Sequence, residues 1–209
     1  MPKPLNPGSP PRLVVGISGA SGIVYGVRLL ETLRHLPVES HLVMSRSAEV
    51  TLAYETDMKV AAVKALADRV YGNEDLAAAV SSGSFKTMGM VVAPCSVKSL
   101  AEIASGVAGS LLARAADVTL KERRRLVLMV RETPLTNGHL RSMLAVSEMG
   151  GIIAPPVPAF YARLESLDQM VTQTVGRVLD LFDLDAPGVS RWGDVVGKGQ
   201  GRRPKSVST

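Results

Sequence analysis

Short apolar runs alternate with longer amphipathic segments along this chain. The runs are rich in branched aliphatic residues, as in strands that are buried on both faces of a parallel sheet. They lie at residues 13–17, 39–45, 89–93, 126–130 and 152–154. Apolar residues at helical spacing predict helices over 23–33, 47–54, 60–70, 75–80, 111–121, 136–149 and 166–182, and one more after the turn at 95–99. This alternation predicts a single α/β domain with a doubly wound parallel sheet, whose ligands bind at the carboxyl ends of the strands.

The first strand ends in a glycine-rich turn that leads directly into a helix. Gly16, Gly19 and Gly22 follow the spacing G-x-x-G-x-x-G, and Ser21 is the expected N-cap of the helix. Glycine lets the backbone approach a ligand closely, and the free amides of a helix N-terminus favour a phosphate. The spacing matches neither the dinucleotide fingerprint nor the phosphate loop that ends in Gly-Lys-Ser/Thr. On this segment alone, a mononucleotide site and a simple packing turn are equally open.

The other predicted strands also end in small hydroxyls or charges. Ser45 follows the second strand, residues 95–99 follow the third, and Arg131 and Glu132 follow the fourth. Because these ends meet at one edge of the sheet, they predict a pocket for a phosphate and a heterocycle. A guanidinium there matches phosphate oxygens, and a neighbouring carboxylate can act as an acid or a base. Glu55, after the second helix, is a weaker candidate of the same kind.

Three charged residues share one face of the helix predicted at 111–121. Arg114, Asp117 and Lys121 form either a solvated stripe of ion pairs or a second cluster that grips a phosphate, on a substrate or across a subunit boundary. Arg177 lies off the apolar stripe of the last helix, as an ordinary solvated charge would. Trp192 is the only tryptophan, and we expect it to pack against the domain or a neighbouring copy.

Cys95 is the only cysteine, which excludes an internal disulfide and a cysteine-cluster metal site. The three histidines are scattered without the spacing of metal ligands, so no metal is expected. A position before a helix N-terminus could activate the Cys95 thiol as a nucleophile. No histidine is recognisably paired with it, however, and a small buried residue is the favoured interpretation.

The two ends of the 209-residue chain carry charges of +2 and +4, and the part between them carries −1, which gives the net charge of +5. We expect a disordered, proline-rich arm over residues 1–11, a single domain over 12–192 and a disordered basic tail over 193–209. The domain has no predicted basic face, so nucleic acid is not an expected partner. No apolar run is long enough to span a bilayer, and the start does not resemble a signal peptide. We therefore expect a cytoplasmic protein that does not bind membranes.

Seven short motifs occur in order along the chain. They are GISGASG at 16–22, ET at 55–56, APCS at 93–96, RAAD at 114–117 with LKER at 120–123, RETP at 131–134, PPVPAFY at 155–161 and RW at 191–192. Together they closely resemble the UbiX family of flavin prenyltransferases. The resemblance extends from about residue 12 to residue 192.

The resemblance implies a flavodoxin-like, Rossmann-like fold and a homododecamer with its sites at subunit interfaces. It also implies transfer of a dimethylallyl group from dimethylallyl phosphate to reduced FMN, first to flavin N5 and then to C6, without a metal. The product, prenylated FMN, is the cofactor of UbiD-type decarboxylases, which would receive it.

The resemblance further implies roles for individual residues. FMN would be held by Gly19, Ala20, Ser21, Ser45, Ser96, Val97, Lys98, Ser99 and Arg131. The prenyl phosphate would be held by Arg114, Lys121, Glu132, Tyr161 and Arg177, several of them across subunits. The implied catalytic set is Ser21, Glu55, Lys121, Glu132 and Trp192. In it, Glu132 protonates the leaving phosphate, Ser21 and Glu55 handle the proton released at ring closure, and Trp192 walls the prenyl pocket, since an indole face attracts a cationic carbon.

Two departures from the family pattern concern Ala162, where a histidine is expected, and Arg125, where a proline is expected. Two rival functions also remain at this stage. One is a flavin-dependent cysteine decarboxylase of a related fold family, in which Arg114, Lys121 and Glu132 would have no task. The other is a non-catalytic subunit that carries FMN to a decarboxylase.

Overall fold

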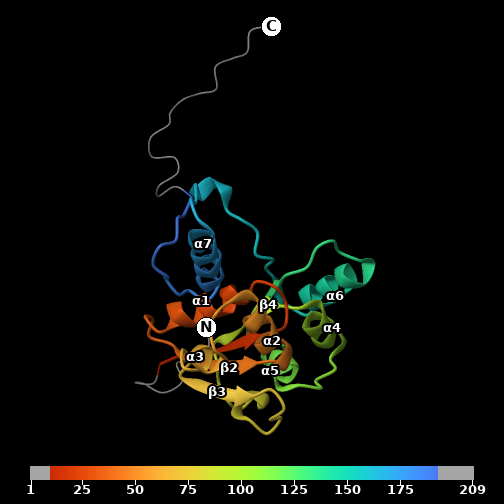
Figure 1. Cartoon of the computed structure of the whole chain (residues 1–209). Helices are drawn as coiled ribbons and strands as arrows, with labels where there is room; N and C mark the ends of the chain where they lie inside the picture. Colours follow the sequence, from red (N-terminus) through yellow and green to blue (C-terminus); the bar gives the residue numbers. More distant parts are fainter. Residues whose placement is uncertain (1–9, 193–209) are drawn as a thin grey trace.

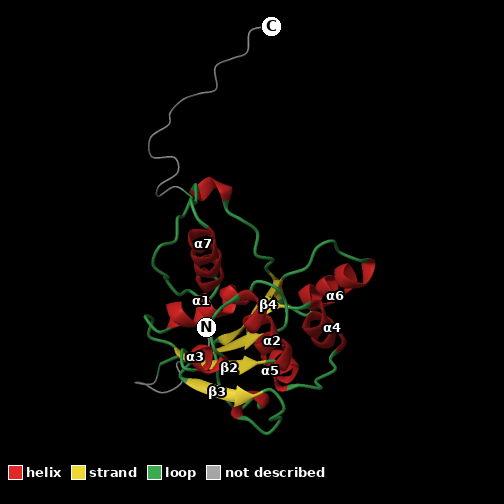
Figure 2. Ribbon diagram, in the orientation of Figure 1, coloured by secondary structure: helices red, strands yellow, loops and turns green. Residues whose placement is uncertain are grey.

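Six strands form one sheet in which every neighbouring pair is parallel, in the order β3-β2-β1-β4-β5-β6. In the computed structural model, which describes residues 10–192, the strands are β1 (Arg12–Ile17), β2 (Glu39–Met44), β3 (Arg69–Gly72), β4 (Gly89–Cys95), β5 (Arg125–Val130) and β6 (Ile152–Ile153) (Figures 1 and 2). The predicted doubly wound parallel sheet is confirmed. Without the edge strand β3, the order is that of flavodoxin-like folds. Most of the predicted arm and all of the tail, residues 1–9 and 193–209, lie outside the described residues.

The helices cover both faces of the sheet (Figure 1). They are α1 (Ile23–Leu33), α2 (Arg46–Glu55), α3 (Val60–Lys64), α4 (Val97–Ser105), α5 (Leu111–Lys121), α6 (Asn137–Glu148) and α7 (Leu167–Asp180), with short 3₁₀ turns at Ala79–Ser81 and Phe160–Ala162. Within residues 10–192, no helix is both long and apolar enough to cross a bilayer.

Successive residues of the central strands point into two separate cores. Leu13 and Val15 of β1 join the core under α1 and α7, whereas Val14 joins the core under α4 and α5. Val127 and Leu128 of β5 divide in the same way. Both faces of these strands are therefore dry, which explains why they are continuously apolar in sequence. Only the strand ends remain available for a polar site.

The region between α2 and β4 differs from the prediction. The helix expected over 60–70 ends at Lys64, and residues 69–72 form β3 on the edge of the sheet. The Tyr71 hydroxyl lies 2.9 Å from Nδ1 of the buried His41 and fixes this strand against β2. Val70 is 41% exposed, so the strand lacks the apolar run that identified the others. The weak helix expected over 75–80 is a turn followed by a 3₁₀ turn.

Candidate active site at the strand ends

The glycine-rich turn after β1 starts α1 in a way that the sequence did not predict. Ser21 is not the N-cap: Gly22 occupies that position with φ of 94°, in the left-handed region, and no side chain of the turn caps the helix. The cap comes instead from Glu55, the last residue of α2. Its Oε2 accepts hydrogen bonds of 2.9 Å from the backbone N–H groups of Gly22 and Ile23. A carboxylate from another helix thus fills the anion site predicted at the α1 N-terminus.

Glu55 is the centre of a small cluster of polar groups. Burial would raise the pKa of Glu55, but hydrogen bonding by the Ser21 hydroxyl and the Ile23 and Gly22 amides, with the positive charge of Arg131, lowers it below its usual value. Glu55 is therefore a carboxylate at neutral pH. Ser21, Glu55 and Arg131 were predicted separately, and the structure brings them together.

Tyr25, in the first turn of α1, belongs to the same neighbourhood. Its ring lies against Gly22, where a Cβ would come within 3.0 Å of the ring carbon Cδ2. Burial raises the pKa of the Tyr25 hydroxyl, and the charge of Arg131 lowers it, with burial the larger effect. Sequence reasoning missed this residue. The signal available in the sequence was the position of Tyr25, three residues after Gly22.

Two serines cap the next two helices at the same edge of the sheet. Ser45 accepts a hydrogen bond from the Ala48 amide at the start of α2, and Ser96 accepts one from the Ser99 amide at the start of α4, both at 3.2 Å. Their prediction as strand-end serines is confirmed in position. The amides of Val97 and Lys98 lie in the first turn of α4, where a helix attracts an anion.

Ser18 joins the β1 and β4 ends of this edge. It is 1% exposed, its hydroxyl donates to the Pro94 carbonyl at 2.9 Å, and it accepts from the Ser96 amide at 2.7 Å. Gly19 follows it, and a Cβ there would come within 2.4 Å of the Ser47 hydroxyl. The turn after β1 therefore packs against the start of α2 so closely that only glycine fits.

Arg131 and Glu132 directly follow β5 on the exposed side of this edge. The Arg131 amide donates to the Cys95 carbonyl at 3.1 Å, which continues the pairing of β5 with β4. The Glu132 carboxylate accepts from the Thr133 amide at 3.0 Å. Both side chains are exposed, so they are available to a ligand or to another copy of the chain.

Lys121 does not reach this edge within one chain, whereas Arg114 lies in the first turn of α5, whose Leu111 amide donates to the Asn73 carbonyl just after β3. Lys121 ends α5 four residues before β5 begins, and it therefore lies at the amino-terminal edge of the sheet. There its ammonium group pairs with Glu122 at 2.5 Å. Arg114 pairs with Asp117 at 2.6 Å, so half of the expected stripe of ion pairs forms.

Tyr161, Arg177 and Trp192 form a third group around α7. The rings of Tyr161 and Trp192 meet edge to face, with centroids 5.7 Å apart. Arg177 forms an ion pair with Asp180, one turn further along α7. Sequence reasoning missed Asp180, whose spacing of three residues from Arg177 was the only signal. The residues predicted to hold the prenyl phosphate are thus spread over one chain, with Lys121 at the end of α5, Glu132 after β5 and Arg177 on α7.

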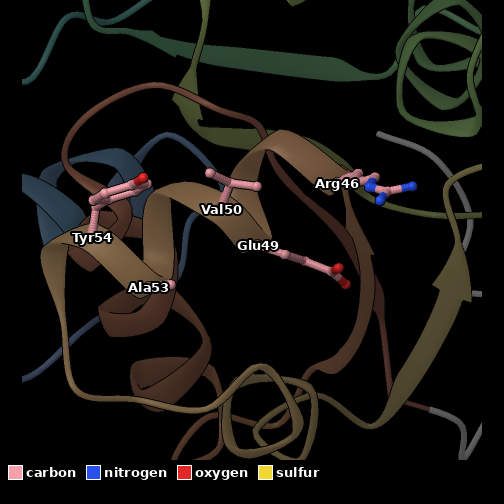
Figure 3. A pocket seen from close by; sticks show the side chains of 5 residues that line it. All are labelled: Arg46, Glu49, Val50, Ala53 and Tyr54. Carbon is pink, nitrogen blue, oxygen red and sulfur yellow. The ribbon is translucent and has the colours of Figure 1, made fainter.

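Other candidate sites have less support for a functional role. Cys95 is fully buried, and burial raises the pKa of its thiol to about 12, which agrees with its interpretation as an inert core residue. A shallow depression on the outer face of α2 is lined by Arg46, Glu49, Val50, Ala53 and Tyr54 (Figure 3), and it contains no predicted site residue. Among residues 10–192, no three His, Cys, Asp or Glu side chains cluster as metal ligands.

Comparison with known proteins relates this geometry to a family. The Flavoprotein family model matches residues 4–179. The flavin prenyltransferase UbiX of Escherichia coli K12 is 56% identical over 184 residues, which cover 87% of this chain and 97% of the relative. UbiX of Thauera aromatica is 53% identical over 181 residues, which cover 87% of this chain and 93% of the relative.

Solved structures of similar proteins point to the same family. A structure of AnUbiX (PadA1) in complex with FMN and dimethylallyl pyrophosphate superposes with a TM-score of 0.86 at 55% identity, covering 88% of this chain and 97% of that one. The FMN-dependent cysteine decarboxylase TvaF superposes with a TM-score of 0.58 at 16% identity, over 69% of this chain and 90% of that one, and so shares only the fold. These matches are considered together with the order of the strands and the grouping of Ser21, Glu55 and Arg131 at the strand ends. They show that this chain belongs to the UbiX family of flavin prenyltransferases.

Proposed function

We propose that the protein transfers a dimethylallyl group from dimethylallyl phosphate to reduced FMN and so makes prenylated FMN. The main support is the Ser21, Glu55 and Arg131 cluster at the strand ends, in a chain that is about 55% identical to proteins named flavin prenyltransferases. A relative with FMN and dimethylallyl pyrophosphate bound supports the pair of substrates. When bound, the reduced flavin supplies the nucleophilic N5 and C6 positions.

The residues at the strand ends fit a flavin phosphate and its ring. Hydroxyls follow β1, β2 and β4, and Gly19 keeps the turn after β1 free of a side chain that would collide with Ser47. Because Glu55 uses the first amides of α1, the starts of α2 and α4 are the better positions for the phosphate. In this proposal FMN is held by Gly19, Ala20, Ser21, Ser45, Ser96, Val97, Lys98, Ser99 and Arg131.

Ser21 and Glu55 would handle the proton that ring closure releases. The lowered pKa of Glu55 keeps it ionised, so it can accept a proton through the neighbouring Ser21 hydroxyl. Glu132, exposed beside Arg131, would protonate the departing phosphate. These two carboxyl groups occupy different environments, which suits opposite roles.

The prenyl phosphate site would be shared between copies of the chain. Its proposed residues are Arg114, Lys121, Glu132, Tyr161 and Arg177, with Trp192 as a wall of the prenyl pocket. In one chain, Lys121 and Glu132 lie at opposite edges of the sheet, so a neighbouring copy has to supply one of them. A relative described as a dodecameric FMN-dependent UbiX-like decarboxylase supports a homododecamer. Preorganised arginine and lysine side chains would neutralise the leaving phosphate without a metal.

A single anaerobic assay tests the function. The protein is mixed with reduced FMN and dimethylallyl phosphate, and mass spectrometry is used to look for a flavin that is heavier by one prenyl unit. The absence of this species would refute the proposal. A cysteine decarboxylase would instead release carbon dioxide from a cysteine substrate, and an FMN carrier would return FMN unchanged.

We further propose that a UbiD-type decarboxylase receives the product and that the protein acts in the cytoplasm. Adding the product to an apo decarboxylase of this type should restore its activity. Cell fractionation followed by immunoblotting tests the location.

A further inference from the structure

The last described residues, 186–192, run back along α7 and are called the C-terminal strap below (Figure 1). The strap packs closely at Gly176 in the middle of the helix. A Cβ at this position would come within 2.0 Å of Cγ2 of Val189. The absence of a side chain at Gly176 therefore lets the strap lie directly against the helix backbone.

Gln173 fastens the strap one turn earlier on α7. Its side-chain amide donates to the Ser190 carbonyl at 2.9 Å and accepts from the Ser190 amide at 2.8 Å. Gln173 is 1% exposed, although most glutamines lie on the surface. A buried amide that satisfies both backbone groups of one residue fixes the position of the strap along the helix.

Asp180 fastens the strap a second time and also holds Arg177. Its Oδ1 accepts from Arg191 at 2.7 Å, and its Oδ2 pairs with Arg177. The Asp180 side chain is 17% exposed, which makes this pairing less screened than the contact of Arg191 with Asp185, whose side chain is 88% exposed. One carboxylate thus connects the strap to a residue of the proposed prenyl phosphate site.

The strap ends at Trp192, whose ring meets Tyr161 edge to face. Trp192 is 73% exposed, so burial in the core does not hold it in place. Its position depends on the strap behind it. We propose that Gln173 and Asp180 are positioning residues: through the strap they place Trp192 against Tyr161, and Asp180 also orients Arg177, so that together they set the affinity for the prenyl phosphate.

This inference rests on the proposed function and predicts that the binding of only one of the two substrates changes. The proposed flavin residues lie in the turns after β1, β2, β4 and β5 and in the first turn of α4, and none of them belongs to the strap or to α7. Loosening the strap should therefore raise the KM for dimethylallyl phosphate and leave the Kd for FMN unchanged. A general loss of structure would change both constants.

The test uses two substitutions with matched controls in the full-length, assembled protein. Gln173→Met removes both hydrogen bonds at similar size. Gln169→Met makes the same change on the exposed side of the same helix, where it removes one hydrogen bond, from the Glu165 amide, and none to the strap. Asp180→Asn removes the shared charge, and Asp185→Asn removes the exposed charge that contacts Arg191 alone. Trp192 is the only tryptophan in the chain, so its fluorescence anisotropy decay reports on the strap directly. Melting temperatures and the Kd for FMN show that each variant is folded.

We expect Gln173→Met and Asp180→Asn to speed the local motion of Trp192 and to raise the KM for dimethylallyl phosphate about tenfold, with a smaller change in kcat. Both controls should behave as the unchanged protein. For Gln173→Met, whose lost bonds join the strap alone, the inference is wrong if KM rises while the motion of Trp192 stays the same, or if Trp192 is freed and KM stays the same. An unchanged protein that makes no prenylated flavin refutes the proposed function instead, and the anisotropy decay then decides alone whether these residues hold Trp192.

Discussion

The strand-end edge and the α7 region both carry polar and charged side chains near the proposed site, but these side chains are held in different ways. At the edge, Ser18 and Glu55 bond to backbone groups of neighbouring elements, and the strands behind them are fully buried. Around α7, Arg177 and Arg191 are held by the carboxylate of Asp180, and Trp192 is largely exposed. These groups of the first region are anchored within one chain. The second presents its groups outward, as expected of a surface that contributes to a site in a neighbouring copy.

The substitutions with the largest expected effect test whether one active site takes residues from two copies of the chain. Lys121→Met and Arg131→Met should each reduce product formation by at least 10²-fold, because Lys121 neutralises the leaving phosphate and Arg131 holds the flavin in the proposed site. When the two variants are mixed as unfolded chains and reassembled, activity should return to roughly a quarter of the normal value, since a random assembly combines two intact residues from different copies in one case of four. Rates of prenylated FMN formation measure this.

The matched control is Lys86→Met, which removes an exposed lysine near the same edge of the sheet as Lys121. It should retain full activity by itself, and its mixture with Lys121→Met should show about half of the normal activity, because half of the sites then receive an intact Lys121. A mixture of Lys121→Met and Arg131→Met that stays inactive would mean that both residues act within one chain, contrary to the comparison above.

Glu55→Gln should slow product formation about 10² to 10³-fold, because an amide cannot accept the proton. The pKa of Glu55 lies below its usual value in the folded protein, so the carboxylate contributes stability above that usual value and loses this contribution as pH falls through the folded pKa. The difference in melting temperature between the unchanged protein and Glu55→Gln should therefore shrink on acidification. Glu49→Gln is the control, since Glu49 lies on the same helix and pairs with Lys64. A constant difference at all pH values would contradict the role of the charge.

Glu132→Gln should slow turnover about tenfold while the Kd for FMN stays unchanged. The exposed carboxylate contributes no bond to the strand ends beyond its contact with the next residue. Flavin fluorescence titration and single-turnover kinetics separate binding from chemistry. Loss of FMN binding in this variant would place Glu132 in the flavin site instead.

The smallest effect is expected at Cys95. The thiol pKa of about 12 predicts that iodoacetamide leaves the folded protein unmodified at neutral pH. Cys95→Ala should keep its activity and lose about 1 kcal/mol of stability from the vacated volume. Mass spectrometry of the treated protein and thermal unfolding measure these outcomes, and rapid alkylation would show that the thiol is accessible after all.

The sequence predicts best where a physical signal is local. The runs at β1, β4 and β5 are apolar because both faces are buried, so their positions and the residues at their ends could be found. The cap of α1 could not be found, because it joins residues 33 positions apart and replaces the local cap expected from Ser21. The strand β3 was missed because an exposed edge needs no apolar run.

Among the site residues too, those with a local signal could be predicted from the sequence, and those that depend on distant segments could not. Arg131 and Glu132 could be placed from the end of one strand, whereas Lys121 could be assigned only by resemblance, since its own helix offers an ordinary ion pair with Glu122. Gln173 gave no sequence signal, because its partner Ser190 lies on a segment without regular structure, and Asp180 gave only its spacing of three residues from Arg177. Interactions between distant segments decide these positions.

The carboxylate of Glu55 at the start of α1 has a consequence for the end of the reaction cycle. The proposed reaction liberates inorganic phosphate, and an uncapped helix terminus beside the flavin would retain such an ion. Here that terminus already holds a fixed negative charge, which repels the departing anion. The same contact that starts the helix therefore leaves these amides unavailable to the phosphate that the proposed reaction liberates.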